Sequence, residues 1–241
     1  MSTDTKKVFI KTYGCQMNDR DSEAVAQDME KAGYEMTDIE TEADVMLFNT
    51  CSVRDQAERK AMGKVGIMQR HLKNKPNLKI GVIGCMAQSK GPEITEKYGH
   101  VDIVVGTDQL HKIPELLEQS EKEQKQIVSR GLSRDILDRL AIHPKGQISA
   151  QISIMRGCNE YCTYCIVPFT RGQEKSRPVA NIISEVKEQP LALLPPVAHL
   201  FILNSVGRQK LIENIVLGCI LYSTIARLVT RVSQTASTHT H

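Results

Sequence analysis

Three short apolar segments of this 241-residue chain each lead into a cysteine, and a stretch with helical character follows each of them. Short strands rich in β-branched and aromatic residues that alternate with amphipathic helices are typical of a parallel sheet built from βαβ units. The pattern therefore predicts an open α/β domain. The three segments are residues 7–13, 44–48 and 79–83, and the cysteines after them are Cys15, Cys51 and Cys85.

Further elements extend the same alternation. A fourth strand is predicted at residues 101–105, and helices are predicted at 22–32, 54–72, 110–126 and, more briefly, after Cys85. A strand-like segment at 151–155 and a helix that begins at Pro178 come later. The predicted organisation is an α/β domain at 5–118, a connector at 119–148, the beginning of a second domain at 149–188, and a tail at 189–241.

The composition excludes several classes of protein. A chain with 41% hydrophobic and 24% charged residues is not disordered or fibrous. The net charge of +3 arises wholly from residues 189–241, so charge alone gives no argument for nucleic-acid binding. The sequence shows neither a secretory signal nor an apolar stretch of about 20 residues, so we expect a cytoplasmic protein without membrane association. In a reducing compartment, seven cysteines indicate metal binding or catalysis before disulfides.

Cys158, Cys162 and Cys165 form a CxxxCxxC motif directly after the strand predicted at 151–155. Three thiolates so close together can bind one face of a compact inorganic cluster and leave a fourth metal corner without a protein ligand. Soft thiolates favour iron–sulfur clusters or zinc, and a structural zinc site usually has four Cys or His ligands. The motif therefore favours an iron–sulfur cluster with one open iron. The alternative is that these are buried or adventitious thiols.

Cys15, Cys51 and Cys85 are also predicted to share a site, because each follows the carboxyl end of a predicted strand. In open parallel sheets, ligands bind in the crevice outside these ends. Three neighbouring strands would bring the three thiols to one place. The alternative is three separate core or loop cysteines at structurally similar positions.

The residues around all six cysteines resemble the methylthiotransferase family of radical S-adenosylmethionine enzymes. The match is close to the branch that acts on the isopentenylated adenosine beside the anticodon of tRNA, and it covers residues 6–188. The similar segments are TYGCQMN at 12–18, NTCSVR at 49–54, GCMAQ at 84–88, RGC at 156–158, IVPFTRG at 166–172 and SRP at 176–178.

The resemblance implies a fold, a set of cofactors and a reaction. The fold is an open parallel-sheet methylthiotransferase domain, followed by only the start of a radical-SAM partial (β/α) barrel. The cofactors are S-adenosyl-L-methionine and two [4Fe-4S] clusters, one bound by each cysteine triplet. The implied reaction is methylthiolation of carbon 2 of the adenosine, with tRNA and an electron donor as partners and a monomer as the expected state. Two alternatives stay open, namely the same chemistry on a ribosomal-protein aspartate and a non-catalytic iron–sulfur module.

Other residues in these segments are weaker candidates. Tyr164 lies either near the adenine of S-adenosylmethionine, as the residue before the third cysteine does across the superfamily, or over the cluster as a packing residue. Arg54, Arg171 and Arg177 are candidate contacts to tRNA phosphate, with ordinary surface or ion-paired arginines as the alternative. Asn18 and Asn49 flank the cysteine loops and are expected to satisfy backbone groups there.

The resemblance stops after Glu188, and the composition changes at Gln189. A full member of the family continues through the rest of the barrel and a small RNA-binding β-barrel. We therefore expect residues 189–241 to come from a truncated or frameshifted reading frame, with a small divergent domain as the alternative. An isolated first barrel strand exposes unpaired backbone, so residues 150–241 are expected to be poorly ordered. This leaves open whether the chain is active.

Overall fold

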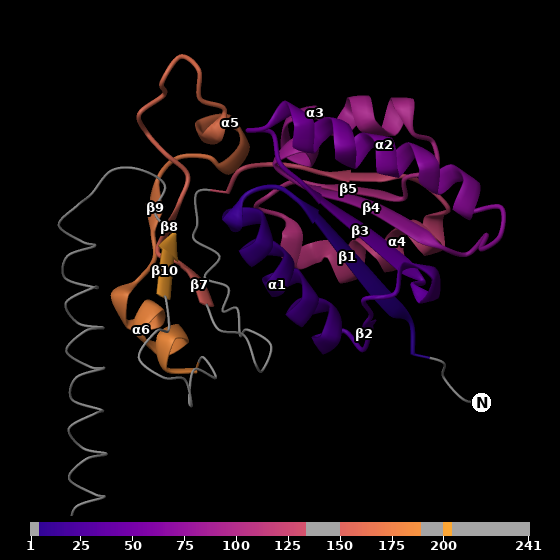
Figure 1. The fold of residues 1–241 in the computed structure, drawn as a ribbon, viewed down its shortest axis with the longest axis horizontal. Helices are drawn as coiled ribbons and strands as arrows, with labels where there is room; N and C mark the ends of the chain where they lie inside the picture. The colour runs from indigo at the N-terminus through magenta and orange to yellow at the C-terminus, as the bar shows by residue number, and fades with distance from the viewer. Residues whose placement is uncertain (1–4, 134–149, 189–199, 204–241) are drawn as a thin grey trace, which may run out of the picture. The chain divides into compact units, whose positions relative to one another are not determined.

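A six-stranded parallel sheet forms the amino-terminal part of the protein (Figure 1). The computed structural model describes residues 5–133, 150–188 and 200–203, which all lie within one unit, Met1–Ser205. The strand order is β2-β1-β3-β4-β5-β6, and every neighbouring pair is parallel. The strands are β1 (Lys7–Tyr13), β2 (Glu35–Met36), β3 (Val45–Thr50), β4 (Lys79–Gly84), β5 (Ile103–Val105) and β6 (Ile127–Ser129).

The burial of the two central strands, β3 and β4, explains why their sequences are so apolar. All of β3 is buried, and β4 is buried except for its first residue, Lys79. Parallel strands that are covered on both faces are built from continuous apolar runs instead of alternating ones. Residues 45–48 and 80–83 follow this rule, so these strands were the simplest to predict.

Helices cover both faces of the sheet. α1 (Gln16–Lys31) and α4 (Ile113–Glu123) pack on one face, where residues such as Val25 and Leu117 join the core. α2 (Asp55–His71) and α3 (Cys85–Lys97) pack on the other face, where Met68 and Met86 meet Phe48. Two short 3₁₀ turns, η1 (Glu40–Glu42) and η2 (Leu110–Lys112), complete this part.

The α/β class that the sequence predicts is confirmed, and the differences concern short elements and boundaries. The prediction lacks β2 and β6, because two or three residues are too few to show a pattern. β6 extends the sheet to Ser129, beyond the expected boundary at 118, so the start of the expected connector belongs to the sheet. α1 begins at Gln16 instead of residue 22, because its first turns bury polar side chains that no apolar periodicity marks.

Residues 150–188 form a second set of elements. β7 (Ala150–Ser153) and β8 (Met155–Arg156) precede the CxxxCxxC loop, and α5 (Val167–Arg171) follows it. β9 (Lys175–Ser176) pairs antiparallel with β8, and α6 (Val179–Glu188) comes next. β10 (Leu200–Leu203) pairs in parallel with β7, so β7, α6 and β10 make one strand–helix–strand unit.

These elements differ from the expectation of poor order after residue 150. The pairing of β10 with β7 supplies the backbone partner whose absence motivated that expectation. Residues 134–148 of the expected connector and the rest of the expected tail, residues 189–199 and 204–241, lie outside the described residues. Within the described part of the chain, no helix has the length and apolar character to cross a membrane.

Candidate metal centre

The three amino-terminal cysteines lie at the carboxyl edge of the sheet. β1, β3 and β4 are neighbours that end in register, with Tyr13 opposite Thr50 and Thr50 opposite Gly84. The strand order reverses between β1 and β3, and ligands bind at such a point in doubly wound sheets. The structure therefore brings three predicted ligands to one edge. The cysteines, each within two residues of its strand end, are Cys15, Cys51 and Cys85.

The thiols of Cys15 and Cys51 are in hydrogen-bond contact. A hydrogen bond from Cys51 to the Cys15 thiolate lowers the pKa of Cys15 to about 5, against the opposing effect of burial. The same contact, aided by burial, raises the pKa of Cys51. Arg171 and the backbone N–H groups of Asn18 and Met17, at the start of α1, lower the pKa of Cys15 further. These contacts favour the thiolate form of Cys15, which is the form that binds metals.

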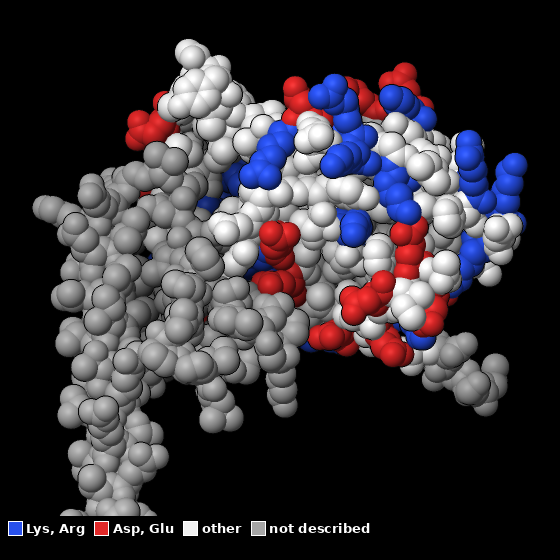
Figure 2. All heavy atoms as spheres, viewed as in Figure 1, with Lys and Arg blue, Asp and Glu red and all other residues white. Residues whose placement is uncertain are grey.

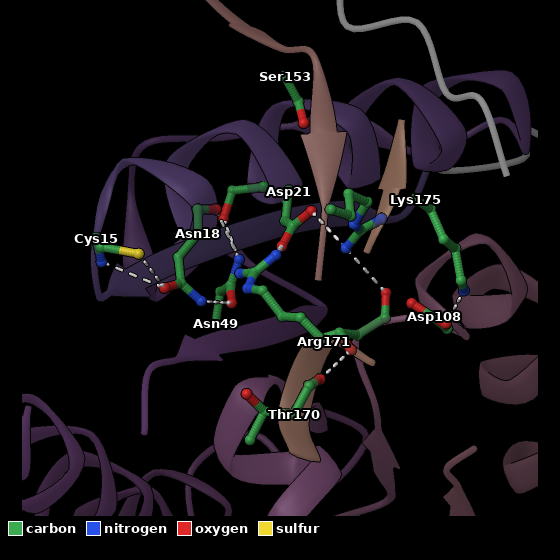
Figure 3. Close-up of polar contacts among 12 residues, drawn as sticks. Cys15, Asn18, Asp21, Asn49, Asp108, Ser153, Thr170, Arg171 and Lys175 are labelled. Atoms are coloured by element: carbon green, nitrogen blue, oxygen red, sulfur yellow. Dashed lines mark hydrogen bonds and ion pairs between the residues drawn. The ribbon is translucent and has the colours of Figure 1, made fainter. Parts of the chain in front are cut away.

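Two buried asparagines hold the cysteine loops together (Figure 3). Oδ1 of Asn18 accepts a hydrogen bond from the backbone N–H of Cys15 (3.2 Å), and Nδ2 of Asn18 donates to the carbonyl of Thr50 (3.2 Å) and to Oδ1 of Asn49 (2.9 Å). Nδ2 of Asn49 donates to the carbonyl of Asn18 (2.8 Å) and to Oγ of Ser22 (2.9 Å). The expected role of these asparagines in satisfying loop backbone is confirmed, and the pair also joins the loop after β1 to the loop after β3.

The donor set suits an iron–sulfur cluster. Sγ of Cys51 accepts a hydrogen bond from the backbone N–H of Val53 (3.3 Å), and such bonds to sulfur tune iron–sulfur sites. Among residues 5–133, 150–188 and 200–203, no three Cys, His, Asp or Glu side chains are placed to hold one metal ion. Three soft thiols at one edge therefore fit a cluster better than a hard cation.

The second triplet lies in a loop that closes on its own start. The backbone N–H of Cys158 donates to the carbonyl of Gly172 (3.1 Å), and the N–H of Cys165 donates to the carbonyl of Cys162 (2.9 Å). Gly157 has φ +75°, and a Cβ there would lie 2.1 Å from a backbone oxygen, so only glycine fits. Cys158 is buried and Cys162 is exposed. The loop thus holds three thiols between β8 and α5.

The aromatic residues of this loop face outward. The side chain of Tyr164 is 90% exposed. Tyr161 has φ +45° and meets Phe169 edge to face, with ring centroids 6.0 Å apart. The described residues therefore give Tyr164 no packing role, and its position near an adenine stays a prediction.

Two of the three candidate phosphate-binding arginines are buried in ion pairs. Nη1 of Arg171 lies 2.9 Å from Oδ2 of Asp21, and Nη1 of Arg177 lies 2.5 Å from Oε2 of Glu185. Both arginines are 6% exposed, so their guanidinium groups are not available to tRNA at the surface, and the ion-paired alternative describes them. Arg54, just before α2, is exposed and stays a candidate.

The sequence did not single out the carboxylates that hold these arginines. Arg20 and Asp21 are consecutive in α1, and each pairs with a residue of the second segment. Nη2 of Arg20 lies 3.1 Å from Oε1 of Glu185, and Nη2 of Arg156 lies 3.2 Å from Oδ1 of Asp21. The partners are 165 and 135 residues apart, and no sequence pattern connects them. We call this set the buried arginine network: Arg20, Asp21, Arg156, Arg171, Arg177 and Glu185.

A Gly84→Ala variant is expected to lose about 1–3 kcal/mol of its free energy of unfolding. Gly84 directly precedes Cys85 and has φ +95°, where any Cβ is strained. The added atom would also lie 2.4 Å from Oδ1 of Asn49 and 2.7 Å from the carbonyl oxygen of Thr50. Urea unfolding followed by circular dichroism measures the loss.

Gly63→Ala is the matched control. Gly63 lies inside α2, and apart from its chain neighbours and the backbone of α2 itself, no atom of the described residues lies within 4 Å of an added Cβ. Alanine there is expected to stabilise the protein by roughly 0.5–1 kcal/mol, since glycine weakens a helix interior. Equal effects of the two substitutions would show that the loop before Cys85 is not strained.

The amino-terminal part of the chain matches known sequences. Residues 7–106 match the family described as Uncharacterized protein family UPF0004. Three relatives are named tRNA-2-methylthio-N(6)-dimethylallyladenosine synthase. The relative from Akkermansia muciniphila is 42% identical over 220 residues, which are 84% of this chain and 48% of that protein. The relative from Methylacidiphilum infernorum is 48% identical over 185 residues (75% and 40%), and that from Clostridium novyi is 45% identical over 186 residues (76% and 41%).

The chain spans less than half the length of these relatives. The identities given above therefore refer only to the part of each relative that this chain covers. The family that the cysteine motifs predict is therefore confirmed. This chain belongs to the family of these synthases and carries the amino-terminal part of their sequence.

Proposed function

We propose that this chain supplies the two cysteine sites of an enzyme that methylthiolates carbon 2 of the isopentenylated adenosine next to the anticodon in tRNA. The convergence of Cys15, Cys51 and Cys85 at one sheet edge is the observation that carries the proposal. The names of the relatives, which refer to 2-methylthio-N(6)-dimethylallyladenosine in tRNA, support the substrate.

Each cysteine triplet would hold one [4Fe-4S] cluster and leave one iron open. S-adenosyl-L-methionine, with the CxxxCxxC cluster and an electron donor, supplies the methyl group and the radical chemistry that an unactivated aromatic carbon requires. The chain's own residues prepare the sites. The hydrogen bond from Cys51, helped by the start of α1, lowers the pKa of Cys15, and Asn18 with Asn49 fixes the loops that carry Cys15 and Cys51. We further propose that the protein acts as a cytoplasmic monomer.

Metal analysis tests this proposal. After anaerobic reconstitution, the full chain is expected to bind about eight iron and about eight sulfide, as two [4Fe-4S] clusters require. Incubation with S-adenosylmethionine and dithionite is then expected to yield 5′-deoxyadenosine. One zinc per chain and no sulfide would contradict the proposed sites. Full iron loading without any 5′-deoxyadenosine would favour a non-catalytic iron–sulfur module.

A cluster of cations marks a surface for RNA. Figure 2 shows lysine and arginine side chains gathered over α2. Nearby lysines are neutralised, as Lys64 is by Glu40. The exposed cations of α2 and its flanks form no ion pair with any described residue, which leaves their charge for phosphate contacts. They are Arg54, Arg59, Lys60, Arg70 and Lys73.

Replacing Arg59 and Lys60 together with alanine is expected to weaken tRNA binding and to flatten its salt dependence. Each phosphate contact contributes about one unit to the slope of log affinity against log salt concentration, so the slope should fall by about two. Filter binding across a KCl series measures the slope. Lys122→Ala is the matched control, because Lys122 is 78% exposed on α4, on the other face of the sheet. Equal effects in both variants would contradict a role for α2.

A further inference from the structure

Arg171 belongs to the second segment but lies at the carboxyl edge of the amino-terminal sheet. It is the last residue of α5, which packs against α3, the helix that begins at Cys85. The carbonyl of the preceding residue, Thr170, accepts a hydrogen bond of 2.6 Å from Oγ1 of Thr107, just after β5. The side chain of Arg171 then reaches Asp21 on α1 (Figure 3). Contacts from three elements thus fix its position beside the loops that carry the first cysteine triplet.

The guanidinium of Arg171 is buried without enough partners. It is 6% exposed, and its Nη1 forms the ion pair with Asp21. Its Nη2 is fully buried and has no hydrogen-bond partner among the described residues. A buried N–H donor without an acceptor is unfavourable, and more so when the group is charged. Such an atom marks the place of an absent acceptor.

The charges at this point are also unevenly paired within the described part of the chain. Asp21 lies within ion-pair distance of both Arg171 and Arg156, so one carboxylate faces two guanidinium groups. Burial alone would lower the pKa of Arg171, but attraction to Asp21, Cys85 and Cys15 raises it. Besides Asp21, the groups whose negative charge acts most strongly on Arg171 are therefore two thiols of the first triplet, Cys85 and Cys15. An anion in this triplet would both neutralise the excess charge and accept the free N–H.

We propose that Nη2 of Arg171 binds the anionic sulfur of the iron–sulfur cluster held by Cys15, Cys51 and Cys85. This inference rests on the proposed function, because it requires a cluster in that site. Arg171 is then a positioning and charge-balancing residue that comes from the segment with the CxxxCxxC loop. The electronic properties of the first site therefore depend on the second segment, which gives the two sites a direct electrostatic connection.

The reduction potential of the first cluster tests the proposal. The experiment uses the full chain with Cys158, Cys162 and Cys165 replaced by alanine, so that only the first cluster forms. In this background, Arg171→Gln is expected to retain about four iron per chain. A nearby positive charge favours the reduced, more negative cluster, so its loss should shift the reduction equilibrium at least tenfold, or about 59 mV toward lower potential for one electron. Dithionite titration followed by electron paramagnetic resonance measures this shift.

Arg156→Gln is the matched control, since Arg156 pairs with the same carboxylate while its Nη2 also donates to the carbonyl of Thr107. It is expected to shift the potential less than Arg171→Gln. Arg171→Lys keeps the charge and the pairing with Asp21, and it should give a smaller shift in the same direction, because one ammonium cannot serve both Asp21 and the sulfur. This variant decides the question if Arg171→Gln does not fold.

The possible results of these experiments distinguish failure of the proposed function from failure of the proposed role of Arg171. Absence of iron in the background protein with Arg171 intact would overturn the proposed function. A loaded cluster whose potential is unchanged in the folded Arg171 variants, or shifted equally by Arg156→Gln, would overturn the role of Arg171 alone.

Discussion

An Asp21→Ala variant is expected to lose about 3–5 kcal/mol of its free energy of unfolding, which is the usual effect of removing one partner from a buried ion pair. Asp21 is 3% exposed and lies within ion-pair distance of Arg156 and Arg171. Without this carboxylate, the buried guanidinium of Arg171 and the partly buried one of Arg156 would both lose the carboxylate with which they pair among the described residues. Urea unfolding of the metal-free protein under reducing conditions measures the loss.

Glu121→Ala is the control for this prediction. Glu121 pairs with Lys6 at 2.9 Å, but both side chains are about half exposed. Exposed ion pairs contribute at most about 1 kcal/mol, so this variant should be close to the wild-type protein in stability. If the two alanine variants lost equal stability, the buried arginine network would not hold the second segment to α1.

Replacing Cys15, Cys51 and Cys85 together with alanine is expected to halve the iron content, from about eight to about four per chain. The CxxxCxxC loop closes through its own backbone hydrogen bonds, so its cluster should assemble without the first triplet. Cleavage of S-adenosylmethionine should therefore persist, while any transfer of a methylthio group should stop. Iron and sulfide analysis after anaerobic reconstitution checks the first outcome.

Two further variants serve as comparisons for this result. Cys219→Ser changes the seventh cysteine, which belongs to neither triplet, and it should leave the iron content unchanged. Alanine at Cys158, Cys162 and Cys165 should remove the other four iron and also abolish cleavage of S-adenosylmethionine. Loss of all iron on removing either triplet alone would contradict two independent sites.

The sequence predicted those parts of the fold that depend on local pattern. β3 and β4 are apolar because both of their faces are buried, and α2 has the periodicity of an amphipathic helix. β6 is too short for such a pattern and was missed, although it completes the sheet. The first turns of α1 were missed for a different reason, because the residues they bury are polar.

The candidate site also has parts that the sequence predicts and parts that it does not. Cysteine is a rare residue whose placement at strand ends can be seen directly in the sequence, so the three thiols of the first site were predicted together. The buried partners of Arg171 and Arg177 were not, since a surface arginine and a buried ion-paired one look identical in sequence. The expected contact of these two arginines with tRNA phosphate was reasonable for their charge, and burial removes it.

The alternation of strands and helices, the two cysteine triplets and the family can be read from the residues alone, because each depends on residue types at short spacing. The three-dimensional arrangement adds that the triplets belong to segments joined by the buried arginine network, and that Cys85 and Cys15 act on Arg171. This cannot be read from the sequence because a buried charge pairs with its counterpart wherever the fold provides one. Here Asp21 and Glu185 provide it across more than a hundred residues of chain.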